Sequence, residues 1–175
     1  LETPERAITG GIRSVGIGAL LGLSEPVGEA LALLRHARHL CRTYWKAGVS
    51  VSFPRIRPQE GGFQPNFTVS DRFLARMIFA FRVGLPDIDL VLSTRESSTF
   101  RDGMAGLGIT RMSIASRTTV GGYVEADAAS ASQFEVCDDR SAEAFCAALR
   151  AKNLDPVFKN WDAAYNNPLA AEEKA

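Results

Sequence analysis

Three arginines follow apolar, β-branched stretches of the chain at points where strands should end. Arg55 and Arg57 come after VSVSFP, and Arg95 comes after IDLVLST. A guanidinium in such a position is partly shielded from water and needs a carboxylate or phosphate partner. The sequence leaves two partners open: an anionic ligand, such as an amino-acid carboxylate, or an acidic residue of the chain itself. The acidic candidates are Glu96, Glu25 and Asp102.

A glycine-rich turn is the second candidate for chemistry. Gly18 and Gly22 lie in the run SVGIGALLGL, where the chain should leave a strand. Because glycine has no Cβ, backbone amides and carbonyls there can approach a flat, polar ligand such as a nucleoside. Glycines in strand-to-loop turns also occur for steric reasons alone, so the pattern allows both a ligand-binding and a purely structural interpretation.

Other catalytic and metal-binding sets have little support. His36 and His39, the two histidines, lie inside one expected helix, away from the strand ends. The cysteines are too irregularly spaced for a disulfide framework, a zinc site or an iron–sulfur cluster, which favours buried, reduced thiols. Glu96 as a general acid or base is a weak hypothesis that rests on its position alone. We therefore assign no catalytic residue and no metal ligand. The three cysteines are Cys41, Cys137 and Cys146.

The elements that must position these residues alternate between strand and helix. Parallel βαβ units have this pattern, and their ligands bind beyond the carboxyl ends of the strands. We expect the first strand to be buried on both faces, because its residues are apolar with little alternation. Strands are predicted within 14–23 and over 49–53, 88–93 and 110–115, and helices from about residue 3 and over 29–45, 70–84, 97–107 and 141–149. A surface loop over 118–133, a short strand within 155–161 and a frayed tail over 166–175 complete the prediction.

Composition and charge exclude several classes of protein. Twenty Lys and Arg balance twenty Asp and Glu, so the net charge gives no support for nucleic-acid binding. A hydrophobic content of 46% suffices for a core and excludes wholesale disorder. Apolar runs fall short of the roughly 20 residues that cross a bilayer, and the first residues lack a secretory pattern. We expect a soluble, cytoplasmic protein with neither membrane nor nucleic acid among its partners.

Short sequence words from about Thr3 to Trp161 match one enzyme family in order and spacing. The words are VGIGALLGLSE, TYW, VSFPRIRP with GGFQP, LSTRES with FRD, GGY, QFE with DDR, and PVFKNWD. They resemble the radical S-adenosylmethionine tyrosine lyases, in particular those of bacterial thiamine biosynthesis. The resemblance implies an α/β fold, namely the C-terminal half of a (β/α)₈ TIM-type radical-enzyme barrel, with about four parallel strands and flanking helices. A whole barrel needs about 250 residues, so this length suits a half.

The resemblance also divides the chain. It places the half-barrel units in residues 1–120, with the cofactor and tyrosine residues at the ends of the strands. Residues 121–165 then form a C-terminal extension that closes the barrel, and residues 166–175 form a disordered tail. The biotin and thiamine synthesis-associated region of the family would fall within this part of the enzyme.

The resemblance implies residues for S-adenosylmethionine. Gly18, Leu20, Gly22 and Glu25 fit the family's GxIxGxxE element, in which backbone and an aliphatic side chain contact the adenine. Arg55 is a candidate for either the cofactor or the substrate carboxylate, and we assign it to the cofactor.

It also implies residues for the substrate. Arg95 is the position expected to hold the carboxylate of tyrosine, because a guanidinium grips a carboxylate at two points. Arg57, like Arg55, could bind either carboxylate, and we assign it to the substrate. The other residues expected to shape this pocket are Ser93, Thr94, Ser113 and Ser116.

The reaction implied is reductive cleavage of S-adenosylmethionine to a 5′-deoxyadenosyl radical, which abstracts hydrogen from L-tyrosine. Fragmentation at Cα–Cβ then gives 2-iminoacetate and 4-cresol. In the family, a CxxxCxxC loop upstream of this region holds the [4Fe–4S] cluster, so we expect the present chain alone to be inactive. Tyrosine, a thiazole synthase subunit and an electron donor are the implied partners.

Two other functions remain open. Hydrogenase-maturation tyrosine lyases make the same cleavage but carry an additional C-terminal cluster on a CxxC-type motif. Cys137 and Cys146 are nine positions apart, which disfavours this alternative. The second alternative is a non-catalytic half-barrel that serves as a binding module.

Overall fold

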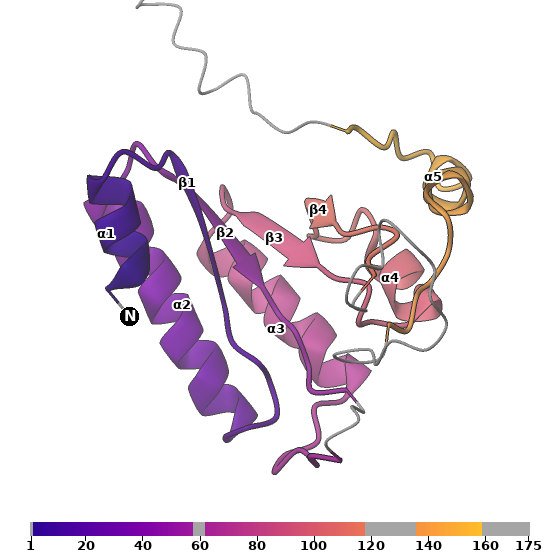
Figure 1. The fold of residues 1–175 in the computed structure, drawn as a ribbon, viewed down its shortest axis with the longest axis horizontal. Coiled ribbons are helices and arrows are strands. Elements are labelled where there is room, and N and C mark those ends of the chain that lie inside the picture. The colour runs from indigo at the N-terminus through magenta and orange to yellow at the C-terminus, as the bar shows by residue number, and fades with distance from the viewer. Residues whose placement is uncertain (1, 58–61, 118–135, 159–175) are drawn as a thin grey trace, which may run out of the picture.

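A computed structural model describes residues 2–57, 62–117 and 136–158 (Figure 1). Its centre is a four-stranded parallel sheet in the order β1-β2-β3-β4. The strands are β1 (Ser14–Gly18), β2 (Gly48–Ser52), β3 (Asp89–Leu92) and β4 (Arg111–Met112). The helices are α1 (Thr3–Thr9), α2 (Pro26–Thr43), α3 (Asp71–Gly84), α4 (Ser98–Met104) and α5 (Ala142–Arg150). The predicted α/β class with four parallel strands and flanking helices is confirmed.

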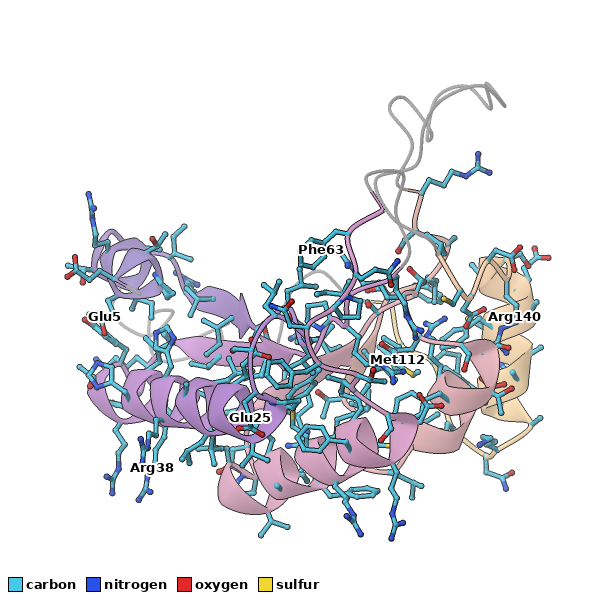
Figure 2. The ribbon with its side chains drawn as sticks, turned by 90° about the horizontal axis from the view of Figure 1, so that it is seen from below. Glu5, Glu25, Arg38, Phe63, Met112 and Arg140 are labelled. Carbon is cyan, nitrogen blue, oxygen red and sulfur yellow. The ribbon has the colours of Figure 1, made fainter. Side chains whose placement is uncertain are left out.

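The core lies between the sheet and the helices α2 and α3, which lie on the same side of it (Figures 1 and 2). Val15 and Ile17 of β1 and Val49 and Val51 of β2 point into this layer and are buried. The helices contribute one apolar stripe each, as their spacing predicts. The buried helix residues are Leu33, Ala37 and Leu40 of α2 and Leu74, Met77, Ile78 and Phe81 of α3.

The prediction that β1 is buried on both faces is wrong. Its residues alternate between exposed and buried, with Ser14, Gly16 and Gly18 on the exposed face. Within the described residues, α2 and α3 cover only the other face, so a run that looks uniformly apolar in sequence is one-sided in the fold. Gly16 and Gly18, which add no polar side chain to this run, lie on its exposed face.

Side-chain caps fix where the helices begin. Ser70, Ser97 and Ser141 each accept a hydrogen bond from the backbone N–H three residues later, at 3.2, 3.3 and 3.2 Å. This geometry is the usual N-cap of a helix. Glu25 caps α2 by accepting from the N–H groups of Val27 and Gly28, so the helix starts at residue 26 rather than at the predicted 29.

Some predicted elements differ from the structure or fall outside it. β4 has two residues instead of six, and residues 155–158 form no strand. The other residues of that predicted strand, the predicted loop over 118–133 and the tail over 166–175 lie outside the described residues. None of the helices in the described part is both long enough and apolar enough to span a bilayer.

Candidate functional site

The segments that follow the strands meet at the carboxyl edge of the sheet. The N–H of Leu21 donates to the carbonyl of Pro54 at 2.8 Å, and the N–H of Ile56 donates to the carbonyl of Leu21 at 3.1 Å. These bonds join the turn after β1 to the loop after β2. That loop also carries Phe63, which lies on the side of the sheet opposite α2 and α3 (Figure 2). The expectation that ligand-binding candidates from different strands share one edge is therefore consistent with the backbone pairing.

Arg55 is buried and bound to acidic residues of the chain. Its Nε donates to Oε1 of Glu96 at 3.1 Å, and its Nη2 donates to Oε2 of the same carboxylate. Nη2 also lies 2.7 Å from Oδ1 of Asp71, and Nη1 donates to the carbonyl of Val69 at 2.8 Å. Burial lowers the pKa of Arg55, but Glu96 and Asp71 outweigh it, so the pKa lies above the ordinary arginine value. Of the two partners left open by the sequence, an acidic residue of the chain is present.

Arg57 binds the same carboxylate but is less completely engaged. Its Nη2 donates to Oε2 of Glu96 at 2.8 Å, and its side chain is 24% exposed. Its Nε is shielded from solvent and has no hydrogen-bond partner in the described residues. Glu96 itself is only 1% exposed, so both guanidinium groups converge on one buried carboxylate.

Arg95 is half-buried in the turn between β3 and α4. Its backbone N–H donates to Oγ of Ser93 at 3.4 Å. Burial lowers the pKa of Arg95, Glu96 raises it and Arg57 lowers it further, and the net pKa lies below the ordinary value. Arg57, Arg95 and Glu96 therefore interact electrostatically at one end of the sheet.

The glycine-rich turn after β1 is explained largely by packing. A Cβ on Gly18 would collide with the hydroxyl of Ser52 and lie 2.9 Å from its carbonyl oxygen. Gly22 has φ +114° and is buried, and a Cβ there would lie 3.1 Å from the carbonyl oxygen of Phe67. Glycine is required at both positions for steric reasons. Leu20, between them, is exposed, whereas the carboxylate of Glu25 caps α2.

The hydroxyl residues of the predicted substrate pocket differ in how deeply they are buried. Thr94 is buried, whereas Ser93, Ser113 and Ser116 are half-buried. The carbonyl of Thr94 accepts hydrogen bonds from the N–H groups of Cys137, at 3.0 Å, and Asp138, at 3.1 Å. The segment after residue 135 is thus anchored directly at the end of β3.

A second buried charge cluster, which the sequence analysis missed, anchors the same segment. Arg101 of α4 is 1% exposed and donates to Asp138 and to the carbonyl of Ser113. Arg140 bridges Asp138 and Asp102, with Nη2 at 2.7 and 2.9 Å from their carboxylate oxygens. Asp102 therefore pairs with Arg140. The alternation of charges in FRD and DDR was the only signal in the sequence, and it does not say which charges are buried.

The histidines and cysteines form no reactive set within the described residues. His39 Nε2 lies 2.8 Å from Oε1 of Glu5, which ties α2 to α1 away from the strand ends. Cys146 is buried, Cys41 and Cys137 are half-buried, and burial raises the pKa of the Cys41 thiol. No group of three His, Cys, Asp or Glu residues with metal-binding geometry occurs in the described part of the chain.

The chain is similar in sequence to two curated proteins. The chain is 44% identical over 164 residues to 2-iminoacetate synthase of Escherichia coli (strain K12), and 42% identical over 164 residues to that of Salmonella typhimurium (strain LT2). These matches cover 93% of the chain but 43% of each relative, so the chain spans less than half of their length.

Two solved structures have the same fold. One is the FeFe-hydrogenase maturase HydG from Carboxydothermus hydrogenoformans, with a TM-score of 0.80 and 34% identity. The other is also a HydG maturase, with a TM-score of 0.83 and 32% identity. Both matches cover 95% of the chain, and they cover 37% and 36% of the solved chains.

A family model supplies the last comparison. The model of the Biotin and Thiamin Synthesis associated domain matches residues 52–155, which is more than half of the chain. The matched range runs from the end of β2 through α5 and includes the Glu96 and Arg101 clusters. The resemblance found in the sequence is therefore confirmed, and the chain belongs to the Biotin and Thiamin Synthesis associated domain family.

Proposed function

We propose that this chain supplies part of the cofactor and substrate site of a radical S-adenosylmethionine tyrosine lyase. The proposed reaction cleaves the Cα–Cβ bond of L-tyrosine to give 2-iminoacetate and 4-cresol for thiamine thiazole biosynthesis. The observation that carries the proposal is the identity of 44% to a 2-iminoacetate synthase over 93% of the chain. Identity to the HydG maturases is lower, at 34% and 32%, which favours this function over hydrogenase maturation.

The turn after β1 fits the nucleoside of S-adenosylmethionine. Gly18 is exposed at the end of the strand and Leu20 is 39% exposed, so backbone and an aliphatic side chain face solvent together. Gly22 and Glu25 act on the cofactor indirectly in this proposal, because they shape the turn and cap α2. Arg55 is the weakest of the assigned cofactor residues, since its N–H groups are engaged by Glu96, Asp71 and Val69.

Arg95 and Arg57 fit the carboxylate of an amino acid. Both are partly exposed at the carboxyl edge, and both lie in the electrostatic field of Glu96. Ser93 sets the turn that presents Arg95. In the proposed site, Thr94, Ser113 and Ser116 line the approach to this carboxylate. A fixed carboxylate determines which hydrogen of the substrate faces the reacting centre.

The cofactor and an iron–sulfur cluster supply the radical chemistry, and this chain contributes binding, orientation and shielding. By the family resemblance, we place the cluster ligands on a CxxxCxxC loop upstream of this region of the enzyme. On this proposal the chain alone does not catalyse the reaction. A thiazole synthase subunit and an electron donor are the proposed protein partners, and the cytoplasm is the proposed location.

A chimeric enzyme tests the function. This chain replaces the matched 43% of the E. coli 2-iminoacetate synthase, and 4-cresol released from L-tyrosine is measured by chromatography. We expect tyrosine-dependent 4-cresol from the chimera and none from the chain alone. We also expect Arg95→Lys to weaken tyrosine binding more than S-adenosylmethionine binding, because lysine lacks the two-point grip. A folded chimera with a full cluster content but no 4-cresol would contradict the proposal.

A further inference from the structure

The carboxylate of Glu96 organises the loop that follows β2. It is almost fully buried, at 1% exposure, and it accepts three N–H groups from two guanidinium groups. A carboxylate removed from water is tolerated only when such partners compensate its desolvation. The position of each of these arginines therefore depends on Glu96.

The two arginines differ in the number of donors that remain. A guanidinium has five N–H groups. Arg55 uses Nε, Nη1 and Nη2, on Glu96, Val69 and Asp71. Arg57 uses Nη2 alone in the described contacts, and its shielded Nε is left without a partner. Arg57 is thus the arginine with donors to spare for an incoming anion.

We infer that Glu96 is a positioning residue that holds Arg57 at the carboxyl edge of the sheet, ready to bind the α-carboxylate of an amino-acid ligand. Arg55 in turn holds Glu96. The inference rests on the proposed function, in which S-adenosylmethionine and tyrosine both carry such a carboxylate. The inference differs from the assignment of Arg55 to the cofactor. Here Arg55 only holds Glu96 in place, and Arg57 binds the carboxylate of the ligand.

The charges around Glu96 support this division. Arg57 lowers the pKa of Arg95, which means that the two guanidinium groups repel each other across this site. Arg55 and Arg57 pair with Glu96, whose charge also acts on Arg95. Asp71 pairs with Arg55 and is 62% exposed, so water screens its charge. An anion that binds between Arg57 and Arg95 would reduce their repulsion.

The test uses the chimera with Glu96→Gln, which keeps the size of the side chain and removes its charge. Dissociation constants for L-tyrosine and for S-adenosylmethionine are measured separately by calorimetry, so turnover is not needed, and KM and kcat are measured alongside. We expect the dissociation constant and KM of one ligand to rise about tenfold or more, the size of a charge-assisted hydrogen bond, with kcat little changed. The ligand affected identifies whose carboxylate Arg57 binds.

Asp71→Asn is the matched control. It removes the other carboxylate that pairs with Arg55 but has no contact with Arg57 among the described residues. We expect both dissociation constants to stay within about twofold, as for an exposed ion pair.

A double-mutant cycle separates positioning from a general loss of structure. If Glu96 acts through Arg57, Arg57→Lys raises the dissociation constant of the same ligand. Adding Glu96→Gln to Arg57→Lys then changes that constant little further. Additive losses would overturn the inference, as would unchanged constants for both ligands in Glu96→Gln. Should Glu96→Gln not fold, Glu96→Asp decides: it keeps the charge but loses reach, and unchanged constants there also overturn the inference. A chimera that is inactive but shows these binding changes would count against the proposed function only.

Discussion

Buried charges at the carboxyl edge are held in pairs by residues that lie far apart in the sequence. Glu96 receives arginines from 41 and 39 positions away, and Asp138 receives Arg101 from 37 positions away. Because both carboxylates and the guanidinium groups of Arg55 and Arg101 are buried, removing one of these partners leaves the other uncompensated, which costs more than losing an exposed pair. These residues therefore stabilise the fold and also hold the segments that follow the strands in place.

Asp138→Asn tests this difference. We expect the free energy of unfolding to fall by about 3 kcal/mol, because Arg101 is left buried without a charged partner. Asp89→Asn, the control, removes the exposed pair with Arg111 and should cost less than about 1 kcal/mol. Urea denaturation of both variants of the chain measures the two values, and equal costs would contradict the role of burial.

The stability that the Arg101–Asp138 pair contributes should depend on pH. Burial raises the pKa of Asp138, but hydrogen bonds from Arg140 and the charge of Arg101 more than offset this, so the pKa lies below its ordinary value. A lowered pKa in the folded state contributes stability above the unfolded value of about 4, and this contribution is lost as the pH falls through the folded value. We expect the gap in stability between the wild type and Asp138→Asn to narrow below about pH 4. Denaturation series at several pH values check this, and a constant gap would contradict it.

At the scale of elements, sequence reasoning located helices better than it located contacts. The predicted helices over 70–84, 97–107 and 141–149 begin within one residue of α3, α4 and α5, because the signals that start a helix are local in sequence. The prediction that β1 is buried on both faces was wrong, because helices distant in sequence determine which face of the strand is covered. The ion pair of Arg55 with Glu96 was one open alternative, and the Arg101 cluster was missed, because pairing across about 40 positions leaves no local pattern.

The close approach of β1 and β2 can be tested at Gly18. A Cβ there would lie 2.9 Å from the carbonyl oxygen of Ser52, so the strands must separate locally in Gly18→Ala. We expect a loss of about 1–3 kcal/mol in the free energy of unfolding, as for overpacking.

Gly16→Ala is the matched control for that change. Its Cβ would meet only the hydroxyl of Ser50, at 3.2 Å, which can rotate away. A smaller loss is therefore expected, and an equal or larger loss in thermal or urea unfolding would show that close approach to the backbone is not the cause.

At the scale of the whole molecule, the sheet built by the described residues does not close on itself. β1 and β4 are the outer strands, and α2 and α3 cover one face among the described residues (Figures 1 and 2). Unpaired strand edges favour association with another chain or with a further part of the same protein. The fold thus matches the expectation of half a barrel.

We predict that the chain alone self-associates as its concentration rises. The reason is the outer edge of β1, which pairs with no strand of the described residues and whose N–H and C=O groups can pair with a second copy. Light scattering coupled to size-exclusion chromatography measures the mass across a dilution series. A monomer at every concentration would contradict this, and the chimera described above should associate less because β1 gains a neighbour there.

One carbonyl oxygen, that of Thr94, accepts two backbone N–H groups from residues 137 and 138. Two stretches of chain about 40 positions apart in sequence are thereby coupled mechanically, and the shared acceptor lies next to Arg95. Substitutions in the later stretch should consequently alter ligand affinity without touching a ligand, so an effect on affinity would not by itself identify a contact residue in this region.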